Sequence, residues 1–203
     1  QSDVNHFDQI SKIMKLYEFD IVFHYAAVVG VKRTLENPMM VLSDIDGTKN
    51  VLDLSVETGV KRFMFSSSSE VYGEPVELPQ HETESPLNAK LPYAIVKNVS
   101  EAYCRTYHQM FDLDYTIMRF FNTYGPLQSN DFVISRFIKQ ALNNEDLTVH
   151  GDGLQTRTFL YIEDNLDFII KLLSDSTCVN DVVNVGSDQQ ISIIDLAQLI
   201  KNI

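Results

Sequence analysis

The sequence predicts an α/β fold, in which helices alternate with the strands of a parallel sheet. Short apolar runs rich in β-branched and aromatic residues, typical of strands buried on both faces, alternate with longer segments of helical periodicity. Polar clusters follow three of these runs, and ligands of such sheets bind at the carboxyl ends of the strands. The clusters are residues 24–30, 66–72 and 122–124.

In the first part of the chain, apolar residues at Phe7, Ile10 and Met14 recur at helical spacing. Further along, Gly59 is suited to end a helix, and Pro92 is suited to a first helical turn. A proline-containing stretch without periodicity, residues 74–91, predicts a long loop. The predicted helices are 7–17, 41–56 and 93–111, and the predicted strands are 20–27, 62–66 and 114–121.

After Gly125 the pattern changes. Ser192 is a predicted N-cap with Asp195 in the capping-box position, and Asp164 is a predicted N-cap of the preceding helix. The predicted helices here are 132–142, 164–173 and 191–203. The predicted strands are 147–150, 158–162 and 181–186, with a turn at 151–153.

Composition excludes several classes of function. Among 203 residues, 16 basic and 28 acidic side chains leave a net charge of −12, which argues against nucleic-acid and anionic-membrane partners. Cys104 and Cys178 are too few for a disulfide framework or a metal site, so a reducing cytoplasmic location is expected. No apolar stretch approaches membrane-spanning length.

The stretch around Tyr93 carries the most chemistry. Tyr93 and Lys97 lie four residues apart in a predicted helix and so share a face. A free tyrosine has a pKa of about 10. A nearby ammonium favours the phenolate, so the pair is suited to remove a proton from a sugar hydroxyl. By itself the spacing favours a surface helix with a half-buried tyrosine and a solvated lysine over a catalytic pair.

Taken together, these pieces resemble the extended short-chain dehydrogenase/reductases, specifically the NAD-dependent nucleotide-sugar epimerases and dehydratases. The resemblance covers the whole chain and rests on the order of six motifs: residues 24–27, 66–73, Tyr93 with Lys97, 121–126, 155–157 and 184–186. It implies a Rossmann-like doubly wound parallel sheet with a small C-terminal substrate-binding region. On this reading, residues 1–124 with 161–186 form the NAD-binding part, and 125–160 with 187–203 the substrate region.

The resemblance also implies roles for single residues. Tyr93 matches the catalytic base, and Lys97 matches the lysine that lowers its pKa and binds the nicotinamide ribose. Ser68 matches the residue that hydrogen-bonds the reacting sugar hydroxyl, and Glu70 matches an acid/base beside C5 of the sugar. The implied cofactor residues are Asp3, Val4, Ala26, Ala27, Ser66, Tyr93, Lys97 and Phe121. The implied substrate residues are Ser68, Ser69, Asn122, His150 and Arg157, of which Arg157 would neutralise the diphosphate.

Glu70 discriminates between the reactions of this family. Glutamate at that position is typical of its dehydratases and decarboxylases, whereas 4-epimerases carry a small or uncharged residue. The run from Ser68 to Glu70 most resembles that of UDP-glucuronate decarboxylases and of GDP-mannose dehydratases, and the stretches 147–151 and 155–159 look closer to the decarboxylases. We therefore expect decarboxylation of a UDP-sugar through a transient 4-keto sugar. A 4,6-dehydratase or a 4-epimerase is the alternative.

The sequence also departs from the family. The glycine-rich phosphate loop after the first strand is absent, so we expect a chain shortened at both ends, and an inactive fragment or a non-catalytic sugar-nucleotide-binding protein stays an alternative. Asp44 stands where a structural Asn is usual, and Arg136 where decarboxylases often have an Asn near the nucleotide. A homodimer through helices 41–56 and 93–111 is expected from the family.

Overall fold

The computed structural model describes residues 2–202 and divides the chain into two compact units. The first comprises Gln1–Phe120 and Ser174–Asn184, and the second Phe121–Leu173 and Val185–Ile203. The predicted α/β class with a parallel sheet is confirmed. The division differs from the sequence expectation, which assigned all of 161–186 to the first part. Helix α7 (Ile162–Ser174) lies almost wholly in the second unit.

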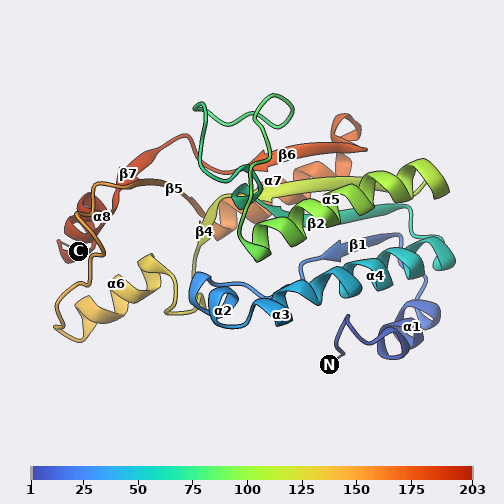
Figure 1. Ribbon diagram of the computed structural model, residues 1–203, viewed down its shortest axis with the longest axis horizontal. Helices are drawn as coiled ribbons and strands as arrows, with labels where there is room; N and C mark the ends of the chain where they lie inside the picture. Colours follow the sequence, from blue (N-terminus) through green and yellow to red (C-terminus); the bar gives the residue numbers. More distant parts are fainter. Residues whose placement is uncertain (1, 203) are drawn as a thin grey trace. The chain divides into compact units, whose positions relative to one another are not determined.

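The first unit is organised around a four-stranded sheet in the order β1-β2-β3-β6 (Figure 1). Strand β2 pairs in parallel with both β1 and β3. Every residue of β2 except Ser66 is buried, which is why this strand reads as an apolar run. The strands are β1 (Ile21–His24), β2 (Arg62–Ser68), β3 (Asp114–Phe120) and β6 (Asp181–Val185).

Strand β1 is shorter and less buried than predicted. It ends at His24, not at residue 27, and Phe23 is 41% exposed. In the described sheet β1 has β2 as its neighbour on one side only, so its apolar side chains are covered less completely than those of β2. The prediction of a strand buried on both faces is therefore wrong for β1 and right for β2.

The helices of the first unit follow the predicted periodicity. The predicted helix 41–56 divides at Ser43, and α4 ends at Gly59, whose φ of 76° suits glycine. Helix α5 packs on β2 and β3, and α4 packs on α5 and β1. The bounds are α1 (Phe7–Leu16), α2 (Val31–Glu36), α3 (Pro38–Leu42), α4 (Asp44–Thr58), α5 (Pro92–Phe111), and the short 3₁₀ helices η1 (Ser69–Tyr72) and η2 (Ser176–Cys178).

The second unit contains a three-stranded sheet in which β5 pairs in parallel with β4 and antiparallel with β7. Helices α6 and α8 pack together, burying Phe137 and Leu196 between them. The predicted N-cap at Ser192 is confirmed, because its Oγ accepts a hydrogen bond from the Asp195 N–H. The bounds are β4 (Asn122–Tyr124), β5 (Thr156–Tyr161), β7 (Gln190–Ser192), α6 (Val133–Leu142) and α8 (Ile193–Lys201).

Two predicted features of the second unit are wrong. Residues 147–150 form no strand, because the N–H of Thr148 donates to the side chain of Gln140 and not to a neighbouring strand. The Gln140 side chain also donates to Thr148 Oγ1, which holds this segment on the end of α6. Asp164 is not an N-cap, since α7 already begins at Ile162 and Asp164 lies in its first turn.

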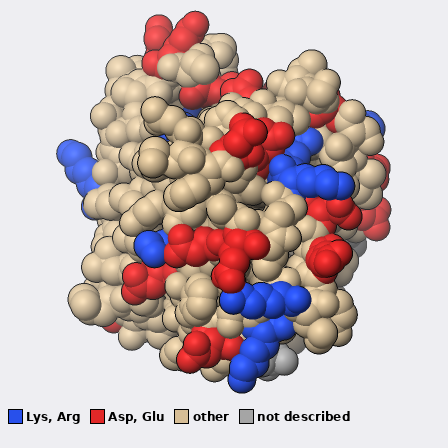
Figure 2. Space-filling model, turned by 90° about the vertical axis from the view of Figure 1, so that its right-hand side faces the viewer, with Lys and Arg blue, Asp and Glu red and all other residues tan. Residues whose placement is uncertain are grey.

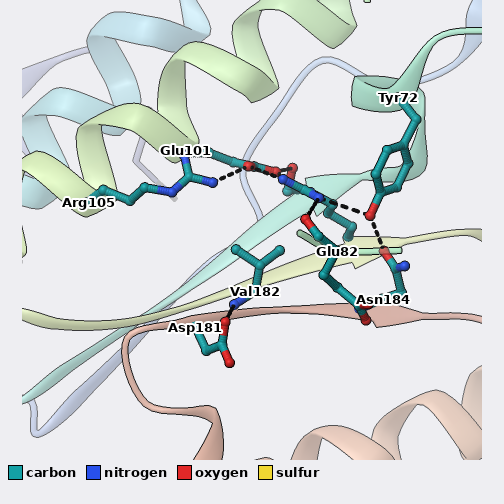
Figure 3. A network of polar contacts seen from close by, with 9 residues as sticks. Tyr72, Glu82, Glu101, Arg105, Asp181, Val182 and Asn184 are labelled. Atoms are coloured by element: carbon teal, nitrogen blue, oxygen red, sulfur yellow. Dashed lines mark hydrogen bonds and ion pairs between the residues drawn. The ribbon is translucent and has the colours of Figure 1, made fainter. Parts of the chain in front are cut away.

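A buried ion pair ties the elements of the first unit together (Figure 3). Arg119 on β3 and Glu101 on α5 are 1% and 0% exposed, and they meet through Nε–Oε1 and Nη2–Oε2 hydrogen bonds of 2.9 and 2.7 Å. The Ser67 hydroxyl donates to Glu101 Oε1 at 2.6 Å. Burial by itself would raise the pKa of Glu101, but the hydrogen bonds from Arg119 and Ser67 outweigh it, so the pKa is lowered.

The same arginine anchors the loop that precedes α5. Arg119 Nη1 donates to the Tyr72 hydroxyl and to the carbonyl oxygen of Glu82. Tyr72 donates to the side chain of Asn184 at 2.7 Å, and the Asn184 N–H donates to Glu82 Oε1. The proline-containing loop predicted from the sequence is therefore held at its middle although it has no helix or strand.

We predict that Arg119→Met destabilises the protein by about 3–5 kcal/mol, because it leaves the Glu101 carboxylate buried with its main partner removed. Urea unfolding followed by circular dichroism measures this. Arg105→Met is the matched control: Arg105 contacts the same carboxylate at 2.9 Å from a side chain that is 41% exposed, so its loss should cost less than about 1 kcal/mol. Equal losses for both variants would contradict the role of burial.

Candidate active site

The carboxyl end of β2 is the first component of the candidate site. Because side chains alternate along a strand, Ser67 turns toward Glu101 while Ser66 and Ser68 project to the other face. Ser68 is 8% exposed, and its Oγ accepts the N–H of Glu70 at 3.2 Å, which caps the short helix η1. Ser69 is partly buried, and Glu70 is exposed at the start of η1. The end of β2 and the start of η1 therefore bring together the hydroxyls of Ser68 and Ser69 and the carboxylate of Glu70.

Helix α5 adds the second component. Tyr93 and Lys97 share a face of α5, as their spacing predicts, with Lys97 Nζ 5.8 Å from the centroid of the Tyr93 ring. The ammonium is 4% exposed, donates to the carbonyl oxygen of Ser66 at 2.6 Å, and lies 5.1 Å from the Phe65 ring centroid. These contacts join α5 to the end of β2.

The charge states differ from the sequence expectation. Burial lowers the pKa of Lys97 to about 8. The pKa of Tyr93 is raised, because burial outweighs a hydrogen bond with Ser68 and because the charges of Glu70 and Asp44 raise it further. The prediction that Lys97 pulls the pKa of Tyr93 down is therefore wrong for this structure. Withdrawing a phenol from water disfavours its ionised form, and this raises its pKa.

The segments matched to the cofactor lie at the ends of other elements. Ala26 and Ala27 follow β1 in a segment without helix or strand, and Ala26 is exposed. Asp3 is exposed and its carboxylate accepts the N–H of Asn5. Val4 packs against the core of the first unit, and its carbonyl oxygen accepts a hydrogen bond from Asn50 on α4. Ala26 and Ala27 thus share the carboxyl edge of the sheet with Ser68, as adjacent parallel strands require.

His24, the last residue of β1, is buried between aromatic rings. Its imidazole stacks on Phe63 and Phe65, and its Nε2 lies 3.1 Å from Thr48 Oγ1. The Thr48 hydroxyl donates its proton to the Asp44 carbonyl oxygen, so Nε2 of His24 must be the donor. This geometry gives His24 a structural role, since the side chain is buried and its ring contacts lie within the first unit.

The remaining predicted residues belong to the second unit. The N–H of Phe121 donates to the Val185 carbonyl oxygen, and the side-chain amide of Asn122 donates to the Thr158 carbonyl oxygen. Arg157 lies on β5 and is exposed, with a hydrogen bond only to the backbone of Thr156 among those described. His150 is exposed beside the turn at 151–153.

Several residues that hold the elements of the site in place were not identified from the sequence. Glu101, one turn after Lys97 on α5, and Arg119 at the end of β3 give no motif signal, although a Glu and an Arg inside otherwise apolar segments are an indication of a buried pair. Ser67 and Tyr72 lie inside the recognised cluster, but their contacts with this pair were not foreseen. On the face drawn in Figure 2, basic side chains lie among more abundant acidic ones, in keeping with the net charge of −12.

Comparison with known proteins decides the family. Residues 1–186 match the family described as "NAD dependent epimerase/dehydratase family". The chain belongs to this family. A UDP-N-acetyl-alpha-D-glucosaminuronate decarboxylase of Bacillus cytotoxicus is 38% identical over 190 residues, which are 89% of this chain and 58% of that protein. A UDP-glucuronate 4-epimerase of Thermodesulfobacterium geofontis is 38% identical over 168 residues, 81% of this chain and 51% of that protein.

Solved structures give the same assignment. The UDP-glucuronic acid 4-epimerase of Bacillus cereus, determined with UDP-glucuronic acid and NAD, superimposes with a TM-score of 0.89 at 30% identity and covers 99% of this chain and 63% of that one. The Rossmann-type fold expected from the sequence is thus confirmed. The chain spans roughly half to two thirds of the length of these relatives. Between residues 2 and 202, no helix has the length and apolarity to cross a membrane.

We predict that His24 stays uncharged down to acidic pH. Burial and the charge of Lys97 lower its pKa from 6.5 to about 4. The unfolded state therefore takes up this proton first, and stability should fall by about 3 kcal/mol as the pH drops from 6.5 to 4. Urea unfolding across this pH range measures how the free energy of unfolding changes with pH. This dependence should be weaker in His24→Asn. His81→Asn, at an exposed histidine, should leave it unchanged. A wild-type slope in His24→Asn would contradict the assignment.

Proposed function

We propose that the intact protein decarboxylates a UDP-linked uronic acid, UDP-glucuronate in the first instance, in an NAD-dependent reaction through a 4-keto sugar. The observation that carries the proposal is the convergence of Ser68, Tyr93 and Lys97 at the carboxyl end of β2: Lys97 donates to the Ser66 carbonyl oxygen and lies 5.8 Å from the centroid of the Tyr93 ring, and the Ser68 hydroxyl acts on the pKa of Tyr93. A phenol, a hydroxyl and an ammonium so arranged suit proton transfer at a sugar hydroxyl.

The donor set fits NAD at this edge. Lys97 supplies an ammonium for a ribose hydroxyl, and the small side chains of Ala26 and Ala27 leave the end of β1 uncrowded. Asp3 and Val4 would lie toward the adenine end, and Phe121 would line the cofactor, as the family resemblance implies. When bound, NAD supplies the acceptor and donor of hydride for the oxidation and re-reduction at C4.

The chain's own residues handle the protons. Ser68 orients the 4-hydroxyl, and Tyr93 takes its proton as the 4-keto group forms. A 4-keto uronate is a β-keto acid, so its C5–C6 bond can break with release of carbon dioxide while the electron pair moves to the keto oxygen. Glu70 then delivers a proton to C5, and Tyr93 returns the first proton to O4. Ser69 and Asn122 would contact the sugar, His150 the base, and Arg157 the diphosphate.

The substrate class is supported by the relatives. The decarboxylase of Bacillus cytotoxicus, the 4-epimerase of Thermodesulfobacterium geofontis and a UDP-glucuronic acid decarboxylase 1 of Xenopus tropicalis are all named for UDP-linked uronic acids. The second candidate function is 4-epimerisation of the same substrate, which the 4-epimerase relatives favour. Exposed Glu70 favours the decarboxylase, because a 4-epimerase has no proton to deliver at C5. A cytoplasmic homodimer belongs to the same proposal.

The test uses the protein encoded by the complete reading frame, incubated with UDP-glucuronate and NAD⁺ and followed by mass spectrometry. We expect carbon dioxide and UDP-xylose. Tyr93→Phe should lower turnover by about 10²–10⁴-fold, the range of general acid–base catalysis. Tyr103→Phe, another tyrosine of α5, is the control and should keep most activity. A product of unchanged mass would replace decarboxylation by 4-epimerisation, and no turnover of any UDP-uronate would refute both.

A further inference from the structure

Asp44 is a carboxylate buried beside the candidate site that no step above uses. It is the first residue of α4 and only 8% exposed. Its Oδ2 accepts the N–H of Val28 at 2.7 Å, and Val28 directly follows Ala26 and Ala27. The carboxylate thus holds the backbone of the segment assigned to the cofactor.

A chain of buried hydroxyls connects Asp44 to the face of α5 that carries Lys97. Thr48, 2% exposed, donates to the Asp44 carbonyl oxygen at 3.0 Å. Ser100, 1% exposed and one turn after Lys97, lies 3.4 Å from Thr48 Oγ1. Asp44, Thr48, Ser100 and Lys97 therefore occupy one continuous buried region where α4 meets α5.

We propose that Asp44 is a positioning residue that holds the Val28 backbone with its carboxylate and places a negative charge in the buried region that also contains Lys97. The proposal deepens the proposed function, because it concerns the same site. An Asn would keep the hydrogen bond to Val28 and lack the charge. Hydrogen bonding and charge can therefore be separated in this protein by changing one atom of one side chain.

The direction of the electrostatic effect follows from the surroundings. The Asp44 charge favours the Lys97 ammonium and raises the pKa of the Tyr93 phenol. Burial raises the pKa of Asp44 itself, although the Val28 N–H and Lys97 oppose this. The other titratable groups that act on these three residues are Asp3 before α1, His24 on β1, Glu70 on η1 and Cys104 on α5.

Removing the Asp44 charge should therefore lower the pKa of Lys97 and the pKa of Tyr93. In Asp44→Asn the pKa of Lys97 should fall from about 8 by about one pH unit, the size expected for a neighbouring charge. The midpoint is measured by NMR from the ¹³Cε resonance of Lys97, assigned with Lys97→Arg, and this readout needs no turnover. Asp46→Asn removes the same charge from an exposed position on α4 and should leave the midpoint unchanged.

Kinetics on the complete protein give the second readout. With Asp44→Asn, both limbs of the pH profile of kcat/KM for UDP-glucuronate should move about one unit toward acid, while NAD⁺ affinity stays within twofold. Asp44→Ala should show the same pH shift and weaken NAD⁺ binding about tenfold, because the Val28 N–H loses its acceptor. A merely structural role predicts no pH shift in Asp44→Asn.

The two readouts distinguish the possible failures. A Lys97 midpoint in Asp44→Asn equal to that of the wild type overturns the proposal, and so does an equal shift in Asp46→Asn. A shifted Lys97 midpoint in a protein that turns over no UDP-uronate supports the role of Asp44 and refutes the proposed function instead. Unchanged NAD⁺ affinity in Asp44→Ala would overturn the positioning half of the proposal.

Discussion

The buried pair of Glu101 and Arg119 is the constraint on which the first unit depends. A carboxylate and a guanidinium withdrawn from water must meet with good geometry, because either one left unpaired costs several kcal/mol. The strand, helix and loop that carry the pair and its partners Ser67 and Tyr72 are thereby fixed in one arrangement. Ser68 follows Ser67 in the strand, and Lys97 and Glu101 lie one turn apart on α5, so the structural pair and the candidate site adjoin each other at the same strand end.

Burial also sets the chemistry of the site. It lowers the pKa of Lys97 to about 8 and raises that of Tyr93, so at neutral pH the structure favours an ammonium beside a protonated phenol. The negative charges of Glu70 and Asp44 act in the same direction on Tyr93. Any change in the charges near Tyr93 therefore alters its ionisation directly.

The fold alone does not select a reaction. Relatives at similar identity are named as a decarboxylase and as a 4-epimerase, so the family's fold supports more than one outcome from UDP-uronates. Within the described chain we propose that the difference rests above all on Glu70, which lies exposed at the start of η1. Ser68 caps η1, so one residue serves both the local backbone and the proposed contact with the sugar hydroxyl.

The sequence by itself determined the class of fold, the helix that carries Tyr93 and Lys97, and the placing of Ser68 at a strand end. These follow from local periodicity and spacing, which act within a few residues. The tertiary structure decided what depends on neighbours distant in sequence: the exposed edge of β1, the ionisation of Tyr93, and the partners of Asp44, Glu101 and Arg119. Burial and charge pairing arise only when remote segments pack, so no local pattern could show them.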